Sequence, residues 1–170
     1  MYKYTSLLSL LVLLFIGLSA CTGSTSTEQL ESPELQLMAE GPLYAGANSS
    51  TATWEFEVAQ LIGEGNKKIS EARISSIEVL LVATDSLPAM EKMVFEITSK
   101  NTPMTRVGLY EGAITSGQPF ALTIADEQEN LASVFTDGKM TFVGDFDMLD
   151  EEYLGNIAFT LKVKFELGIK

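Results

Sequence analysis

The chain has 170 residues, with eleven Lys and Arg against twenty-three Asp and Glu, no histidine and one cysteine. Such an acidic chain lacks the clustered basic side chains that bind nucleic-acid phosphates. Because the chain has no histidine and only one cysteine, its composition excludes Ser-His-Asp and Cys-His catalysis, metal sites built from His or Cys, and internal disulfides. Carboxylate chemistry, Ser-Lys pairs and oxygen-ligated metals remain. We therefore expect a protein that is not an enzyme, needs no cofactor and binds no nucleic acid.

The first twenty-one residues are typical of an export signal. Lys3 provides a basic start, and residues 7–18 are almost uninterruptedly apolar but too few to span a bilayer comfortably. The tetrapeptide Leu18-Ser19-Ala20-Cys21 follows, with small residues before the cysteine. It resembles the lipobox of bacterial lipoproteins. The resemblance implies that residues 1–20 are a removed signal peptide and that Cys21 is acylated, palmitate being one of its acyl groups. The alternative is an ordinary secretory signal with Cys21 left as a free thiol.

Lipidation implies a location in the cell envelope. Several acyl chains hold a protein in a membrane far more firmly than one chain does. Position 22 is threonine rather than aspartate, and the first acidic residue is Glu28. By resemblance to Gram-negative lipoproteins, these features favour the outer membrane, with the domain on the periplasmic face rather than on the cell surface.

Residues 21–41 are expected to be a flexible tether that follows the lipidated cysteine. Small polar residues and acids dominate this segment, and such sequences seldom bury enough apolar surface to fold. Twenty flexible residues have a root-mean-square span of about 25 Å. The folded domain is then expected over residues 42–170. The alternative is that Leu35, Leu37 and Met38 begin a first strand within the tether segment.

Period-two alternation of apolar and polar residues recurs along that domain, and it predicts half-buried antiparallel strands. Trp54, the only tryptophan, shares its parity with Ala52 and Phe56. This parity favours packing in the core over the alternative, a platform on which a sugar stacks. The strongest alternation lies in residues 157–169, where we expect one long strand that bends near Gly168. The other predicted strands cover residues 51–59, 77–83, 93–98, 105–110, 120–124 and 140–143.

Two segments interrupt the strand pattern. Residues 126–129 resemble a capping box, and apolar residues follow at helical spacing, which predicts a short helix over residues 127–135. Residues 63–72 are expected to form a loop. The fold class is therefore all-β: an antiparallel two-sheet β-sandwich, immunoglobulin-like or jelly-roll-like, with one short helix.

A second resemblance concerns the whole domain. The residues 41–48 before an alternating strand, the apolar run at Ile77, the capped segment near Leu131 and the long closing strand are similar to small uncharacterised β-sandwich lipoproteins of Gram-negative bacteria. This resemblance implies an anchored sandwich with no known activity, and no catalytic residue is carried over from it.

One acidic segment is a candidate calcium site, because calcium takes six to eight oxygen ligands and carboxylate-rich loops supply them. The alternative is a solvated acidic turn that leads into the last strand. Its spacing does not match the helix-loop-helix calcium pattern. The candidate ligands are Asp145, Asp147, Asp150 and Glu152.

Some aromatic residues are candidates for recognition, because the pattern places them in turns or on an outward strand face. These are Tyr44, Tyr110, Phe146 and Tyr153. A Ser-Lys dyad of Ser70 with Lys67 or Lys68 is disfavoured, because nothing in that polar loop would desolvate the lysine.

Together these observations predict a membrane-anchored, non-enzymatic lipoprotein whose acidic sandwich is a structural or protein-interaction module of the cell envelope. Its partners would be the membrane, through the anchor, and an unidentified envelope protein or glycan. The alternative is an outer-membrane lipoprotein that binds carbohydrate or a small ligand. A third class, an enzyme that uses only carboxylates, would need two acids about 5 to 9 Å apart in a cleft.

Overall fold

The computed structural model describes residues 26–84 and 86–170. The predicted signal peptide 1–20 and the predicted lipidation site Cys21 lie outside these residues. Within the described part, no helix has both the length and the apolar character needed to cross a bilayer.

Strands make up most of the described chain. The structure also has two helices of five residues each. In chain order the elements are β1 (Ser26–Glu31), β2 (Leu35–Ala39), β3 (Leu43–Glu55), α2 (Val58–Ile62), β4 (Ile69–Leu81), β5 (Met90–Thr98), β6 (Thr105–Ala113), β7 (Pro119–Ala121), β8 (Thr123–Ile124), α3 (Ala132–Thr136), β9 (Lys139–Tyr153) and β10 (Ile157–Ile169).

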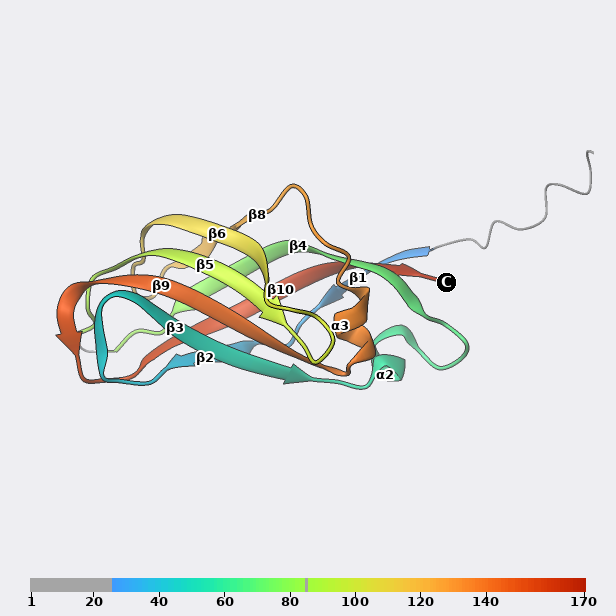
Figure 1. Cartoon of the computed structure of the whole chain (residues 1–170), viewed down its shortest axis with the longest axis horizontal. Coiled ribbons are helices and arrows are strands. Elements are labelled where there is room, and N and C mark those ends of the chain that lie inside the picture. The colour runs from blue at the N-terminus through green and yellow to red at the C-terminus, as the bar shows by residue number, and fades with distance from the viewer. Residues whose placement is uncertain (1–25, 85) are drawn as a thin grey trace, which may run out of the picture.

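All the strands belong to one ten-stranded antiparallel sheet, in the order β7-β4-β10-β2-β3-β9-β5-β6-β8, with β1 pairing beside β2 on β10 (Figure 1). The two ends of this order, β7 and β8, are separated in the chain by Leu122 alone. The Leu122 N–H donates a hydrogen bond of 3.1 Å to the Ile77 carbonyl of β4. The sheet therefore curls almost into a closed barrel.

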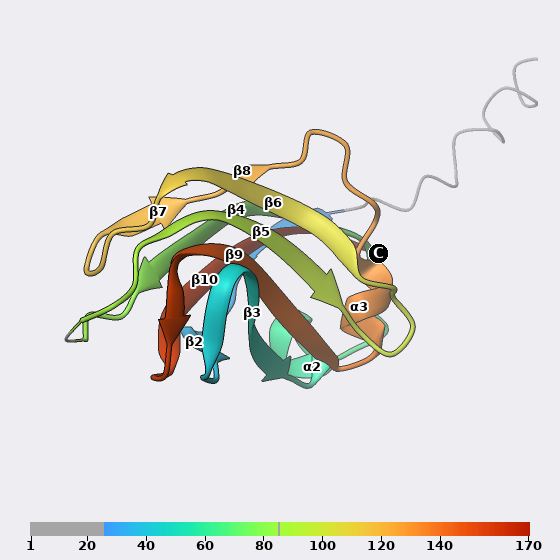
Figure 2. The ribbon, with the colours of Figure 1, turned by 60° about the vertical axis from the view of Figure 1, so that its left-hand side comes forward.

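The curled sheet forms two facing layers, with β3, β9, β5 and β6 in one and β2, β10 and β4 in the other (Figure 2). Side chains meet across the interior between strands that are not neighbours in the sheet. The Phe146 ring of β9 lies 5.3 Å from the Phe159 ring of β10, and the Trp54 ring of β3 lies 6.3 Å from the Phe165 ring of β10. These contacts define one apolar core. The predicted all-β antiparallel sandwich is confirmed, with both layers drawn from one continuous sheet.

The long final strand follows the predicted alternation. Its odd-numbered residues from Ile157 to Ile169 are all buried, whereas Lys162 and Lys164 are exposed. The pairing of β10 with β4 shifts register between Gly168 and Ile169, where the sequence predicted a bend, and also between Lys164 and Phe165. These irregularities let a thirteen-residue strand follow the curvature of the barrel.

The predicted flexible tether over residues 21–41 is wrong from Ser26 onward, because β1 and β2 both pair with β10. Ser32 links these two strands: its N–H donates to the Val163 carbonyl, and its hydroxyl accepts from the Val163 N–H. Two ion pairs reinforce the pairing, Glu31 with Lys164 and Glu34 with Lys162. The acids that suggested disorder locally are thus matched by lysines about 130 residues later in the chain.

Two element boundaries also differ from prediction. The predicted strand over residues 51–59 ends at Glu55, and Val58 begins helix α2. The predicted helix over residues 127–135 is shorter, because α3 begins only at Ala132. Residues 126–131 instead run along the edge of β4, where the side chains of Gln128 and Asn130 bond to the backbone of that strand. The hydrogen bonds to β4 therefore outweigh the local helical preference of residues 127–131.

Candidate functional site

The four candidate calcium ligands lie on strand β9 rather than in a loop, so the prediction of an acidic turn over residues 145–152 is wrong. Phe146 and Met148 are both 1% exposed and face the core. Their burial stabilises the strand conformation of this acidic segment. The alternation Asp-Phe-Asp-Met in residues 145–148 is itself a strand signal, and the density of acids obscured it.

The same strand geometry keeps the four carboxylates apart. Strand residues rise about 3.3 Å each and alternate between the two faces of the sheet, so the four carboxylates are spread along β9 and do not share one face. Asp145 accepts a hydrogen bond from the Ser49 hydroxyl, and Asp150 accepts one from the Ala89 N–H at 2.8 Å. Across residues 26–84 and 86–170, no three Asp, Glu, His or Cys side chains are grouped to hold a metal ion. The arrangement does not build the predicted calcium site.

The candidate recognition aromatics do not form one platform. Phe146 is buried, so its predicted exposure is wrong. Tyr110 of β6 stacks against Phe120 at 4.4 Å, and its hydroxyl donates to the Ala113 carbonyl. Tyr44 is 56% exposed and Tyr153 is half-buried, both at the end of the β3–β9 pair. Trp54 is 8% exposed and packs 4.7 Å from Phe56, which confirms its predicted place in the core.

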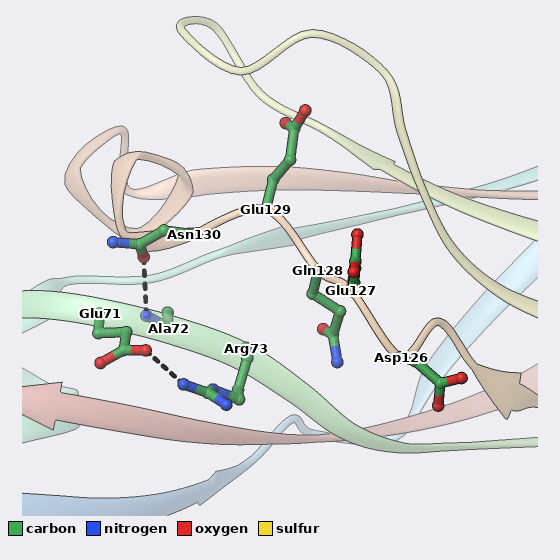
Figure 3. Close-up of a pocket in the computed structure, with 8 residues that line it drawn as sticks. All are labelled: Glu71, Ala72, Arg73, Asp126, Glu127, Gln128, Glu129 and Asn130. Atoms are coloured by element: carbon green, nitrogen blue, oxygen red, sulfur yellow. Dashed lines mark hydrogen bonds and ion pairs between the residues drawn. The ribbon is translucent and has the colours of Figure 1, made fainter.

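A polar surface pocket of about 280 Å³ lies between the edge of β4 and the segment before α3 (Figure 3). Its lining residues are Glu71, Ala72, Arg73, Asp126, Glu127, Gln128, Glu129 and Asn130. Glu71 forms an ion pair with Arg73 along the exposed surface of β4. The Glu129 side chain points away from β4, on the opposite side of its segment from the Asp126 side chain (Figure 3). The carboxylates therefore do not converge on one point, as an acid and base pair would.

Two side-chain amides in this pocket substitute for a neighbouring strand. The Asn130 amide accepts from the Ala72 N–H and donates to the Ser70 carbonyl, both at 3.0 Å. The Gln128 amide accepts from the Ile74 N–H and donates to the Ile74 carbonyl, both at 2.8 Å. An unpaired strand edge is a template for association with other chains. The pocket is thus the covered edge of β4, and sequence analysis missed this role of the two amides.

Hydrogen bonds hold the pKa of Asp137 below its usual range. The Ser99 hydroxyl donates to the Asp137 carboxylate at 2.6 Å, and the Asn101 N–H donates to it at 2.9 Å, so the charged form is favoured. Asp137 is the C-cap residue of α3. Its carboxylate therefore fixes the loop between β5 and β6 to this helix, which is a structural role.

The side chain of Lys139 similarly lowers the pKa of Glu55, through a hydrogen bond of 2.7 Å across the β3–β9 pair. No Ser-Lys dyad forms at Ser70, whose hydroxyl donates to the Gly168 carbonyl at 3.0 Å. The loop predicted over residues 63–72 ends at Lys68, because Ile69 begins β4.

Segments that are far apart in the sequence meet at each end of the barrel. We call one end the basal end: residues 26–28 of β1, residues 63–68 between α2 and β4, and Lys170. Its parts are adjacent, because Ser26 pairs with Ile169 and because Lys68 and Lys170 exchange backbone hydrogen bonds of 2.8 and 2.9 Å. We call the opposite end the tip: residues 40–48 and 147–156, where Tyr44 pairs with Glu152. The tip carries the exposed Leu154 and Tyr44.

Comparison with known proteins does not show which family the chain belongs to. No protein-family model and no curated protein matches it. Among solved structures, it is similar to a chain of turnip yellow mosaic virus (12% identity, TM-score 0.30, covering 85% of this chain and 94% of that one) and to one of mud crab tombus-like virus (8%, TM-score 0.33, 94% and 98%). A chain of infectious bursal disease virus, Gt strain, is also similar (8%, TM-score 0.31, 86% and 42%). Likeness at these TM-scores assigns neither family nor function.

Proposed function

We propose that this protein is a non-enzymatic lipoprotein of the bacterial cell envelope, anchored through acylated Cys21, whose sandwich is a structural or protein-interaction module. The observation that carries the proposal is the position of β1. This strand begins at Ser26, so only four residues separate it from the lipobox cysteine. An anchor at Cys21 would therefore be joined directly to a folded edge of the domain, which suits a module held in place at a membrane.

The chemistry of the described residues supports a binding or structural role over catalysis. The side-chain amides of Gln128 and Asn130 at the β4 edge are used in hydrogen bonds to the backbone, and the acids of β9 are spread along a strand. Neither arrangement pairs a nucleophile with a base or two carboxylates in a cleft. The aromatic candidates do not form one platform, because Tyr110 packs against Phe120 away from Tyr44 and Tyr153, so their arrangement does not support a carbohydrate site.

Substitution of the cysteine tests the anchor. Cys21→Ser should move the protein from the washed membrane fraction to the soluble fraction of the cell envelope, and metabolic labelling with a palmitate analogue should be lost. Thr22→Ser, at the neighbouring position, should change neither result. Retention of the Cys21→Ser protein in washed membranes, at the level of the unchanged chain, would overturn the proposal.

We also propose an outer-membrane location with the domain on the periplasmic face. The absence of aspartate at position 22 and of acids before Glu28 supports this location. Protease added to intact cells should leave the domain undigested, whereas the same protease should digest it once the outer membrane is permeabilised. Digestion on intact cells whose periplasmic markers survive would place the domain on the cell surface.

A further inference from the structure

Strand β1 has one free edge. Along its other edge all of its residues, Ser26–Glu31, pair with β10 (Figure 1). No strand within residues 26–84 and 86–170 pairs with the free edge. The side chains of β1 are exposed at every position except the half-buried Leu30. The edge of β4 differs, because the side-chain amides of Gln128 and Asn130 cover it.

The hydrogen-bond pattern shows which backbone groups the free edge offers. The Ser32 N–H donates to the Val163 carbonyl of β10 at 2.8 Å. Along an antiparallel ladder, residues alternate between bonding to the neighbouring strand and pointing away from it. Counted back from Ser32, the even-numbered residues of β1 bond to β10. The N–H and carbonyl groups of Thr27, Gln29 and Glu31 therefore point outward, and such groups are a template for another strand.

This edge is complementary to itself in an antiparallel pair of β1 strands with Gln29 at the centre. Gln29 then faces Gln29 of the second copy, and Thr27 of each copy faces Glu31 of the other. These are the residues whose backbone groups point outward, so each facing pair can exchange two hydrogen bonds. The acids Glu31 and Glu28 face the uncharged Thr27 and Leu30, so no like charges lie directly opposite each other.

Charge is nearly balanced along β1, although the chain has a formal net charge of −12. Glu31 lies 3.7 Å from Lys164, and Glu28 lies 4.0 Å from Lys67. Each acid of this strand is thus paired with a lysine of the same chain. Repulsion between the other charges of two copies is screened beyond a Debye length of about 8 Å at physiological salt. A second copy can therefore approach this edge.

We propose that β1 is a dimerisation edge: two copies of the chain join through antiparallel β1 strands centred on Gln29, and the sheet continues from one copy into the other. The inference rests on the proposed interaction module and names its partner, a second copy. In this dimer the two Ser26 residues are about 20 Å apart, at about 3.4 Å per residue. The five residues from Cys21 to Thr25 span at most about 17 Å. One bilayer can therefore hold both proposed anchors.

Cysteine cross-linking tests the pairing and its register. In the chain from residue 21 to residue 170 with Cys21→Ser, the further change Gln29→Cys places the only thiol at the centre of the pair. Facing Cα atoms of a hydrogen-bonded pair are about 5.5 Å apart, which suits a disulfide, so mild oxidation should give a covalent dimer.

The register control is Thr27→Cys, at an equally exposed position of the same strand. Its two thiols would lie four residues apart along the pair, about 14 Å, so covalent dimer should form roughly tenfold more slowly. A mixture of Thr27→Cys and Glu31→Cys chains, whose thiols face each other, should give the mixed dimer.

A backbone change tests the hydrogen bonds. Gln29→Pro removes the outward N–H, and proline is tolerated on an edge strand where this group faces solvent. Sedimentation velocity of the Cys21→Ser chain should show a dimer whose fraction rises with concentration. Gln29→Pro should weaken dimerisation by at least about tenfold, whereas the control Gln29→Ala keeps the N–H and should change it by less than about threefold.

Equal cross-linking of Gln29→Cys and Thr27→Cys, or equal dimerisation of Gln29→Pro and Gln29→Ala, would overturn the inference. A chain that stays monomeric up to about 1 mM would also overturn it and would leave the β1 edge to a strand of another protein. The tested chain carries no lipid. Failure here would therefore leave the proposed anchor standing, and failure of the Cys21→Ser test in cells would not alter the dimerisation result.

Discussion

Removal of the Phe159 ring should destabilise the protein by about 4 to 5 kcal/mol, the upper part of the range for deletion of a core aromatic side chain. Phe159 is fully buried, and in the sheet it pairs with Leu37 on one side and Leu81 on the other. Across the core it meets Phe146 edge to face at 5.3 Å. Because these neighbours belong to three strands held by separate ladders, the cavity in Phe159→Ala has little room to collapse.

The matched control is Lys162→Ala, on the outer face of the same strand. Its ion pair with Glu34 spans 3.4 Å between side chains that are 47% and 60% exposed, so its loss should cost less than about 1 kcal/mol. Urea unfolding of the chain without residues 1–21, followed by the fluorescence of buried Trp54, measures both changes. Equal losses of stability in the two variants would show that the assigned faces of β10 are wrong.

A double-mutant cycle then isolates the contact between the layers. Phe146→Ala and Phe159→Ala should show a coupling free energy of about 0.5 to 1.5 kcal/mol, the range for an aromatic pair in contact. Additive losses would contradict a direct contact between β9 and β10 across the core.

Three further results are expected. Asn130→Ala leaves the Ala72 N–H and the Ser70 carbonyl without their partner, so it should lower the free energy of unfolding by about 1 to 3 kcal/mol and cause concentration-dependent association visible by gel filtration. The control Glu129→Ala should lower the free energy of unfolding by less than about 0.5 kcal/mol. Similar losses in the two variants would refute the role of Asn130 in covering the edge of β4. The pKa of Asp137 is lowered from 3.8, so its stabilisation is complete above that pH and is lost as the pH falls through the lower folded-state value. The stability difference between the unchanged chain and Asp137→Asn should therefore shrink below pH 3.8, and a constant difference would contradict it. Saturating calcium should leave the Tm unchanged, because the acids of β9 do not converge, and a calcium-dependent rise would restore the calcium hypothesis.

Strands with one buried and one exposed face could be recognised in the sequence, because their pattern depends only on the period of the strand itself. The alternation from Ile157 to Ile169 and the parity of Trp54 predicted their burial correctly. The same signal was present in residues 145–148, where a cluster of acids outweighed it. The last residues of β9 are exposed and acidic, so this part of the strand has the composition of a loop.

Segments whose structure depends on distant partners could not be recognised in this way. Strand β1 is exposed along nearly its whole length, and it is ordered by its ladder to β10 and by lysines far along the chain. The local sequence places Gln128 and Asn130 in a predicted capped helix. In the structure their side-chain amides instead cover the edge of β4, more than fifty residues earlier in the chain. Neither pairing leaves a periodic signal in its own segment.

The sequence by itself determined which catalytic and metal-binding residue types the chain contains, and it indicated the all-β class of the domain, because composition and strand period are local properties. Only the tertiary structure decided that β1 and β2 pair with β10, and that the two ends of the sheet meet through Leu122. These features depend on contacts between residues far apart in the chain. The free energy that stabilises these contacts comes from the pairing of two distant segments, so it leaves no pattern in the sequence of either segment alone.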